Sequence, residues 1–254
     1  MLDFVRKLSS ESGRLALAEF AKLRTRDIDF KSEKDLVTVA DRRIEDFIIS
    51  KIHRKFPGHD IFGEETGRTS KGSEYCWVID PIDGTTSFVH GQPFFSVSIA
   101  LNKNGRTIAG AVNAPKLGEM FWAEKGKGAF CNGRRIHVSG RDKLISSVLS
   151  TGFACIRSDL KENNLPILNR IIPKLRGIRR YGSAAVDLSY VACGRLEGFW
   201  ELNLKPYDIA AGVLIVQEAG GEVCDLKGKS NYPEDGMLAT NGKITRQFLQ
   251  SQKE

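Results

Sequence analysis

The chain has 254 residues, 41% of them hydrophobic, and a net charge of +7 from 38 Lys and Arg against 31 Asp and Glu. The basic residues are scattered without a run of five or six like charges or interleaved aromatic residues, which argues against a dedicated nucleic-acid-binding surface. Five widely spaced cysteines without a C-x-x-C pair argue against a disulfide framework and a zinc site.

The N-terminus lacks the apolar core of a signal peptide. Charged residues such as Asp3, Arg6 and Lys7 interrupt its apolar positions. The longest apolar stretches, such as residues 209–216, are too short to cross a bilayer. The sequence therefore predicts a cytoplasmic protein without a membrane partner.

Two amphipathic helices are predicted at the start of the chain. Apolar residues recur at helical spacing over residues 2–23. A second apolar stripe covers residues 44–56, behind a capping box formed by Thr38 and Asp41. Pro57 ends this second helix.

Short apolar runs separated by turn residues predict an antiparallel sheet in the middle of the chain. Asn-Gly pairs at 104–105 and 132–133 are typical of tight hairpin turns. The expected strands are residues 60–63, 76–79, 94–101, 106–113, 119–123, 129–131 and 135–138.

After about residue 146, strands and helices alternate. Ser183 is expected to cap a helix that ends at Gly194, and Pro206 to begin the next helix. The expected strands are 147–151, 177–181, 198–202, 222–225 and 237–240, and the other expected helices are 165–175 and 245–250. We expect one domain over residues 1–254, with an N-terminal lobe of about 1–142 and a C-terminal lobe of about 143–254.

The segment D-P-I-D-G-T-T, which begins at Asp80, directly follows a buried strand. Asp80 and Asp83 can converge on one cation there, and hard oxygen ligands select Mg²⁺, Mn²⁺ or Ca²⁺. Gly84 permits close approach of the backbone, and the amides of residues 84–86 can hold a phosphate if a helix starts there. Taken alone, the segment is better explained as an Asp-rich turn with local hydrogen bonds.

Further acids lie at comparable positions. Glu64 and Glu65 are adjacent at a strand end, which is costly unless they are solvated or bind a cation. Asp208 lies in the first turn of a predicted helix, where stabilisation of the helix dipole is an adequate explanation. Asp41 can likewise be a capping acid.

Together, in this order and spacing, these segments resemble the inositol monophosphatase family. The likeness covers nearly the whole chain, and it is carried by residues 35–41, 63–65, 77–86, 182–185 and 205–221. The resemblance implies an α+β fold, an alternately layered αβαβα sandwich of the inositol monophosphatase and fructose-1,6-bisphosphatase type, in a homodimer. It also implies dependence on two or three Mg²⁺ ions per site, with Mn²⁺ as a substitute and Li⁺ as an inhibitor.

The resemblance also assigns roles to ten residues. The implied metal ligands are Glu64, Asp80, the carbonyl of Ile82, Asp83 and Asp208. The implied substrate contacts are Asp83, Gly84, Thr85, Thr86, Ala184, Glu201 and Asp208, of which Ala184 and Glu201 face the leaving alcohol. The implied catalytic residues are Glu64, Thr85 and Asp80, with Thr85 and Glu64 orienting the attacking water.

The expected activity is that of a phosphoric monoester hydrolase, which cleaves inositol 1-phosphate to inositol and phosphate with metal-activated water. The chain has Ser87 where the family usually has Asn, and Tyr207 where it frequently has Trp. These departures leave open which phosphorylated polyol is the substrate. Fructose-1,6-bisphosphatase and histidinol-phosphatase activities are alternatives on the same scaffold.

Alternatives of other classes are an RNA- or transcription-complex-binding role of the basic surface, a haloacid dehalogenase phosphatase and a serine hydrolase. The spacing of the two aspartates is one residue too long for a haloacid dehalogenase motif. The four histidines have no G-x-S-x-G partner, as a serine hydrolase would require.

Overall fold

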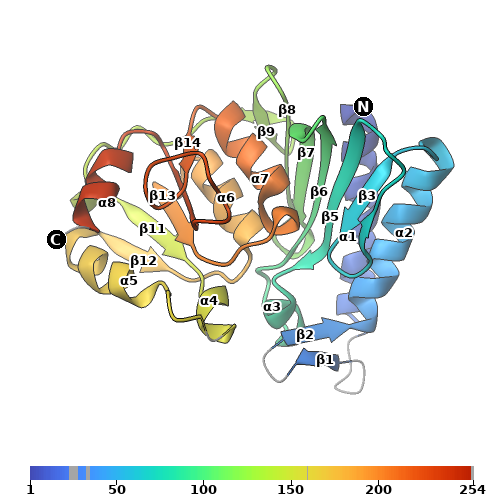
Figure 1. The fold of residues 1–254 in the computed structure, drawn as a ribbon, viewed down its shortest axis with the longest axis horizontal. Helices are drawn as coiled ribbons and strands as arrows, with labels where there is room; N and C mark the ends of the chain where they lie inside the picture. The colour runs from blue at the N-terminus through green and yellow to red at the C-terminus, as the bar shows by residue number, and fades with distance from the viewer. Residues whose placement is uncertain (23–27, 33–34, 159, 253–254) are drawn as a thin grey trace.

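Helices and sheets alternate in five layers in the computed structural model (Figure 1), which describes residues 1–22, 28–32, 35–158 and 160–252. For residues 28–32 and 35–38 it describes the backbone alone. The helices are α1 (Leu2–Phe20), α2 (Val39–Lys55), α3 (Thr85–Val89), α4 (Ala154–Arg157), α5 (Leu165–Ile171), α6 (Ala184–Ala192), α7 (Pro206–Glu218) and α8 (Thr245–Ser251). Within the described ranges, no helix has the length and apolar content needed to span a membrane.

The larger sheet has eight strands in the order β10-β9-β8-β7-β6-β5-β3-β4. Its strands are β3 (Asp60–Gly63), β4 (Gly67–Thr69), β5 (Tyr75–Asp83), β6 (Ser96–Lys103), β7 (Arg106–Ala114), β8 (Glu119–Glu124), β9 (Ala129–Cys131) and β10 (Arg134–Ile136). All neighbours are antiparallel except β3 and β5, which pair in parallel. The predicted antiparallel middle of the chain is therefore confirmed.

The smaller sheet has five strands in the order β12-β11-β13-β15-β14. They are β11 (Val148–Thr151), β12 (Gly177–Arg179), β13 (Gly198–Glu201), β14 (Glu222–Cys224) and β15 (Met237–Thr240). The pairs that β11 forms with β12 and β13 are parallel, and the other two pairs are antiparallel. A separate hairpin of β1 (Ile28–Ser32) and β2 (Asp35–Thr38) lies beside α3 (Figure 1).

The layering follows from which faces of the sheets are apolar. Helices α1 and α2 cover one face of the large sheet, α6 and α7 lie between the two sheets, and α5 and α8 cover the outer face of the small sheet (Figure 1). The central core contains Val78 and Val112 of the large sheet and Phe199 and Ala239 of the small sheet. The αβαβα sandwich implied by the sequence is confirmed.

The alternation of side chains along β5 divides it between two cores. Trp77 and Ile79 pack with α1 and α2, whereas Val78 faces the central helices. Because successive side chains of a strand point to opposite faces, Asp80 leaves the sheet on the same side as Val78. The first acid of the sequence motif is thereby directed toward the central layer.

The ends of several elements differ from the sequence expectations. Strand β5 continues to Asp83 through an irregularity in its pairing with β6, instead of ending at residue 79. The helix expected over residues 165–175 ends at Ile171 and continues as the 3₁₀ turn Ile172–Lys174, because Pro173 cannot donate an α-helical hydrogen bond. Strand β4 and helix α4 were not predicted, because each is too short to show periodicity.

The predicted caps of helix α6 can be compared with the structure, whereas the predicted capping box before α2 cannot. Ser183 Oγ accepts a hydrogen bond from the Val186 N–H at 3.2 Å, and Gly194 ends the helical segment at φ +74°, so both predictions are confirmed. The capping box of Thr38 and Asp41 involves a side chain outside the described residues. Leu23, the last residue of the first apolar stripe, also lies outside them.

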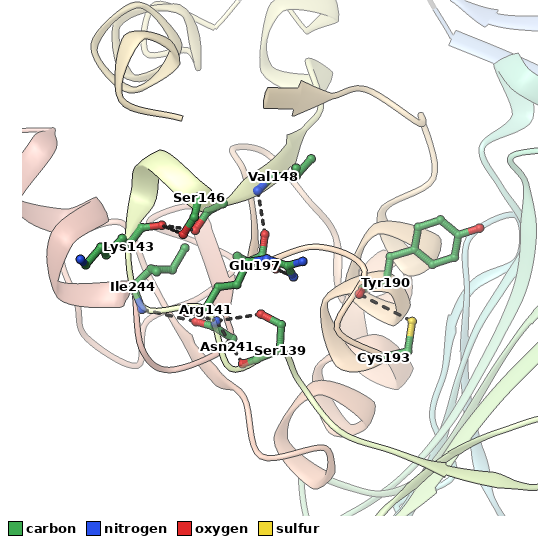
Figure 2. A network of polar contacts seen from close by, with 11 residues as sticks. Ser139, Arg141, Lys143, Ser146, Val148, Tyr190, Cys193, Glu197, Asn241 and Ile244 are labelled. Atoms are coloured by element: carbon green, nitrogen blue, oxygen red, sulfur yellow. Dashed lines mark hydrogen bonds and ion pairs between the residues drawn. The ribbon is translucent and has the colours of Figure 1, made fainter. Parts of the chain in front are cut away.

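Two buried polar side chains hold the segment that connects the two sheets (Figure 2). Glu197 is 1% exposed and accepts hydrogen bonds from Arg141 Nη1 at 3.0 Å and from the Val148 N–H at 2.7 Å. Asn241 Nδ2 donates to the carbonyl oxygens of Ser139 at 3.2 Å and Arg141 at 2.7 Å. Its Oδ1 accepts from the backbone at residues 243 and 244. These bonds fix the connection from both sides.

Replacement of Asn241 by Ala should lower the free energy of unfolding by about 2–3 kcal/mol, because it leaves several buried backbone groups without partners. Urea denaturation should show a lower midpoint with an unchanged m value. The matched control is Asn231→Ala, which removes an exposed side chain that donates to Asp235. Equal losses in the two variants would contradict the role given to the Asn241 network.

Candidate active site

A cleft of about 110 Å³ opens where the ends of β3, β5, β11 and β13 meet the first turns of α3, α6 and α7. All ten residues to which the sequence assigned a role line this cleft: Glu64, Asp80, Ile82, Asp83, Gly84, Thr85, Thr86, Ala184, Glu201 and Asp208. The structure therefore brings the whole predicted set together, from segments more than 100 residues apart.

Glu64 is positioned by the turn that follows β3. Its N–H donates to the Ile79 carbonyl at 3.1 Å, which extends the parallel ladder between β3 and β5. The buried carboxylate of Glu45 on α2 accepts hydrogen bonds from the N–H groups of Glu65 at 3.1 Å and Thr66 at 2.7 Å. A helix on the opposite side of the sheet thus fixes the backbone that carries Glu64.

Asp80 is the most deeply buried of the predicted acids. It is 1% exposed, and its Oδ1 has no hydrogen-bond partner among the described residues. Burial, reinforced by the charges of Glu64, Asp83 and Asp208, raises the pKa of Asp80 well above its usual range. Ionised acids this close destabilise one another, so the site favours bound protons or a cation.

Asp83 joins the end of β5 to the start of α6. Its Oδ2 accepts hydrogen bonds from Ser183 Oγ at 2.5 Å and from the Ala185 N–H at 2.7 Å, and its Oδ1 accepts one from the Ala184 N–H at 3.2 Å. Burial raises the pKa of Asp83 to about 6, although these hydrogen bonds favour its ionised form. The carboxylate also lies at the positive end of the helix dipole.

Asp208 lies in the first turn of α7, as the sequence predicted. Its Oδ2 accepts a hydrogen bond from the Lys205 N–H at 2.6 Å, so it caps the helix. Burial, followed by the charge of Asp83, raises the pKa of Asp208 well above its usual range. Asp208 therefore both caps α7 and lines the cleft.

The backbone turns sharply where β5 passes into α3. Gly84 adopts φ +92°, and a Cβ there would lie 2.8 Å from the carbonyl oxygen of Phe94, so only glycine fits. Thr85 begins the helix, which meets the condition set for a phosphate cradle. Its Oγ1 lies 3.1 Å from the Ile82 carbonyl oxygen and 3.4 Å from Asp41 Oδ1.

Glu201 lies at the end of β13, on the side of the cleft formed by the small sheet. It is 7% exposed and accepts a hydrogen bond from the Ala154 N–H at 3.0 Å. Gly152 permits this approach, because a Cβ there would overlap the Glu201 carboxylate. Burial raises the pKa of Glu201 to about 7. Ala184 lines the same cleft from the start of α6.

Three further charged residues line the cleft without having been assigned a role. Asp187 is 2% exposed with an unpartnered Oδ1 in the described part of the chain, and burial raises its pKa well above the usual range. Arg180 belongs to the basic cluster 174–180, which by itself is typical of solvated surface. The sequence signal that could have identified Arg180 is its position two residues before Gly182, where one of the segments that carry the family resemblance begins. Arg157 also lines the cleft, but no sequence signal identifies it, because it belongs to α4, which is a single helical turn.

The donor set fits a hard cation. The acids supply only oxygen ligands, and the buried Oδ1 of Asp80 is an acceptor without a donor. Among the described residues, however, no three histidine, cysteine, aspartate or glutamate side chains are arranged so that they could hold a metal ion as they stand. Mg²⁺ usually keeps several water ligands and takes one or two carboxylates, which suits such an open arrangement.

Comparison with known proteins agrees with the sequence resemblance. The family model described as "Inositol monophosphatase family" matches residues 1–254. An inositol-1-monophosphatase of Mesorhizobium japonicum is 38% identical over 255 residues, covering 100% of this chain and 96% of that relative. The Nus factor SuhB of Pseudomonas aeruginosa is 40% identical over 255 residues, covering 98% of this chain and 94% of that relative.

Solved structures give the same result. The extragenic suppressor protein suhB of Bartonella henselae superposes with a TM-score of 0.91 at 36% sequence identity. The match covers 98% of this chain and 96% of that structure. The fold and the chain length are thus shared over nearly the whole of both proteins.

The raised pKa of Glu201 predicts a pH-dependent stability difference in metal-free protein. The folded state holds the Glu201 proton more tightly than the unfolded state does, so protonation of Glu201 stabilises the folded protein. This contribution is fully present below pH 4.5 and is lost as the pH rises to about 7. Relative to the native protein, Glu201→Gln should gain up to about 3 kcal/mol across that window.

Urea denaturation of both proteins in a chelator at several pH values measures this gain. Glu162→Gln is the control, because Glu162 is exposed and lies outside the cleft. A stability difference between native protein and Glu201→Gln that stays constant from pH 4.5 to 7 would refute the titration.

Proposed function

The chain belongs to the inositol monophosphatase family, and we propose that it hydrolyses the phosphate monoester of a polyol, with inositol 1-phosphate as its preferred substrate. Membership of this family supports a phosphatase. The observation that carries the proposal is the crowding of Glu64, Asp80, Asp83 and Asp208 around one cleft, with three of these acids held at raised pKa. Such crowding is costly unless the site serves a cationic group and its anionic substrate.

The cofactor in this proposal is Mg²⁺, in two or three ions. The residues that would hold it are Glu64, Asp80, the Ile82 carbonyl, Asp83 and Asp208. When bound, Mg²⁺ lowers the pKa of water and offsets the negative charge of the phosphate. Substitution by Mn²⁺ and inhibition by Li⁺ belong to the same proposal.

Thr85 and Glu64 would orient the attacking water. The Thr85 hydroxyl can donate to the Ile82 carbonyl or to Asp41 Oδ1, which leaves its oxygen free to accept a hydrogen bond from water. The first amides of α3 lack acceptors within the helix, so the backbone of residues 84–86 can donate to phosphate oxygens. This role is supported by the position of Gly84, Thr85 and Thr86, which all line the cleft.

Glu201 and Ala184 would face the leaving alcohol. The Ala154 N–H fixes the carboxylate of Glu201 at the cleft wall, where it can accept hydrogen bonds from polyol hydroxyls. Fructose 1,6-bisphosphate and histidinol phosphate remain alternative substrates, and kcat/KM over a panel of these esters with Mg²⁺ distinguishes them. We expect a homodimer, a cytoplasmic location and one domain over residues 1–254.

A second candidate function is binding to RNA or to a transcription complex, which the name of the Pseudomonas relative, a Nus factor, favours. The net charge of +7 supports it only weakly, because the charges are scattered. The dependence of RNA affinity on salt concentration tests this role separately from hydrolysis.

Replacement of Asp80 by Asn should abolish turnover and leave the fold intact, because the fold does not use Asp80 Oδ1. Without Mg²⁺ the variant should melt at a higher temperature than the native protein, since one repelling acid is removed. Asp225→Asn is the control: Asp225 is a buried acid that accepts backbone N–H groups in a loop away from the cleft. That variant should lose stability but retain turnover. Near-normal kcat in Asp80→Asn would exclude this site.

Replacement of Glu201 by Gln should reduce kcat/KM for inositol 1-phosphate by roughly 1–3 kcal/mol, the scale of a hydrogen bond to a charged group. Turnover of p-nitrophenyl phosphate should hardly change, because this ester lacks the polyol hydroxyls. Equal losses on both esters would make Glu201 part of the catalytic machinery. No loss on either would remove it from substrate recognition.

A further inference from the structure

Asp187 is a buried acid of the cleft to which the proposed function gives no role. It lies in the first turn of α6 and lines the cleft three residues after Ala184. Because residues three apart in a helix lie on the same face, the two side chains point in the same direction. An alcohol that contacts Ala184 therefore also lies beside Asp187.

The start of α6 does not need Asp187 as a cap. The first two N–H groups of the helix donate to Asp83, and the N–H of Val186 donates to Ser183 Oγ. The N–H of Asp187 itself donates to the Ser183 carbonyl at 2.9 Å. The N–H groups of this helix start thus have acceptors already. The helix dipole favours an acid here, but it supplies no hydrogen bond to the carboxylate.

The carboxylate of Asp187 lacks a donor in the part of the chain that the structure describes. It is 2% exposed, and its Oδ1 has no hydrogen-bond partner among those residues. Ser150 on β11 faces Asp187, but Ser150 Oγ is likewise without a partner in the described ranges. A buried acceptor without a donor costs free energy, so Asp187 requires a donor that these residues do not supply.

The charges around Asp187 are balanced on this side of the cleft. Burial raises the pKa of Asp187, and the charge of Glu201 raises it further, which places the two acids near each other. Arg180 lowers the pKa of both acids, and Arg157 lowers that of Glu201. Asp83 also acts on both, but it belongs to the residues that would hold Mg²⁺. Two arginines thus offset two acids. A cationic ligand gains no net attraction there, whereas a neutral donor can still bond to both carboxylates.

We propose that Asp187 determines substrate specificity together with Glu201, and that each carboxylate accepts a hydrogen bond from one of two neighbouring hydroxyl groups of the leaving alcohol. The substrate is then the phosphate ester of a vicinal polyol. Esters of aromatic alcohols or amino alcohols, which lack such a pair, are disfavoured because they leave a buried acceptor without a donor. This inference rests on the proposed function, because it concerns the alcohol bound in the same cleft.

Steady-state kinetics with inositol 1-phosphate tests the assignment. Asp187→Ala should lower kcat/KM about tenfold to a hundredfold, the range expected when a hydrogen bond to a charged group is lost. Asp187→Asn, which keeps an acceptor oxygen, should lose less. Turnover of p-nitrophenyl phosphate should change less than about twofold in both variants, because this ester has no hydroxyl to offer. Equal losses on the two esters would overturn the proposal.

Monodeoxy analogues of inositol 1-phosphate separate recognition from a general loss of structure. For one analogue, the native protein should lose the same factor in kcat/KM that Asp187→Ala loses with the full substrate. Asp187→Ala should not discriminate against that analogue. Glu201→Gln should lose discrimination at a different hydroxyl position. Losses that multiply independently for every analogue would show that Asp187 contacts no hydroxyl.

Thermal denaturation without substrate provides the second arm. Asp187→Ala should melt at or above the temperature of the native protein, because it removes a buried carboxylate that no described residue satisfies. Asp225→Ala is the matched control: it removes a buried acid that accepts the N–H groups of residues 227, 229 and 231. This control should melt lower and keep the native discrimination among the analogues. A loss of stability in Asp187→Ala as large as in Asp225→Ala would make Asp187 a structural residue.

Failure of this inference and failure of the proposed function give different results. Absence of turnover on every ester would refute the phosphatase function and, with it, the role of Asp187. Native kcat/KM of Asp187→Ala with inositol 1-phosphate would refute only the role of Asp187, and would leave water as the partner of its Oδ1.

Discussion

The hydrogen bonds of the Asp83 carboxylate are the constraint on which the cleft depends. They join residues 100 positions apart in the chain, the end of β5 and the first turn of α6, and so connect the large sheet to the central helices. The carboxylate is buried, and its ionised form is favoured by three donors that α6 supplies. Once this contact forms, Gly84 must turn sharply beside Gly182, and the start of α3 is directed into the space between the sheets.

Much of this arrangement was predictable, for identifiable reasons. Two Asn-Gly turns and regular alternation indicated the large sheet, and the motif that starts at Asp80 indicated the acids. The sequence could not predict Arg157 or Asp187 as cleft residues. A single helical turn has no periodicity, and an acid in the first turn of α6 is explained by the helix dipole alone. Such positions depend on tertiary contacts between distant segments, which no local pattern reports.

A second cavity, of about 680 Å³, lies on the other side of the first turn of α7 from the cleft, and strand alternation places residues of one strand in both. On β5 the side chains of Val78 and Asp80 leave the same face, so one apolar and one acidic position follow each other along one wall. The first turn of α7 forms the partition between the two spaces, with Tyr207 packed against Phe62 at a ring distance of 5.7 Å.

The connection between the sheets has a consequence for how the molecule opens. Helices α6 and α7 bury side chains of both sheets in one core, and Glu197 and Asn241 fix the backbone segment that links the sheets (Figure 2). The outer face of the small sheet packs on α5 and α8, but its inner face is buried only by the central helices that also bury the large sheet. Slow hydrogen exchange should accordingly be lost from both sheets in the same opening event, with no long-lived species in which one sheet is folded and the other is not.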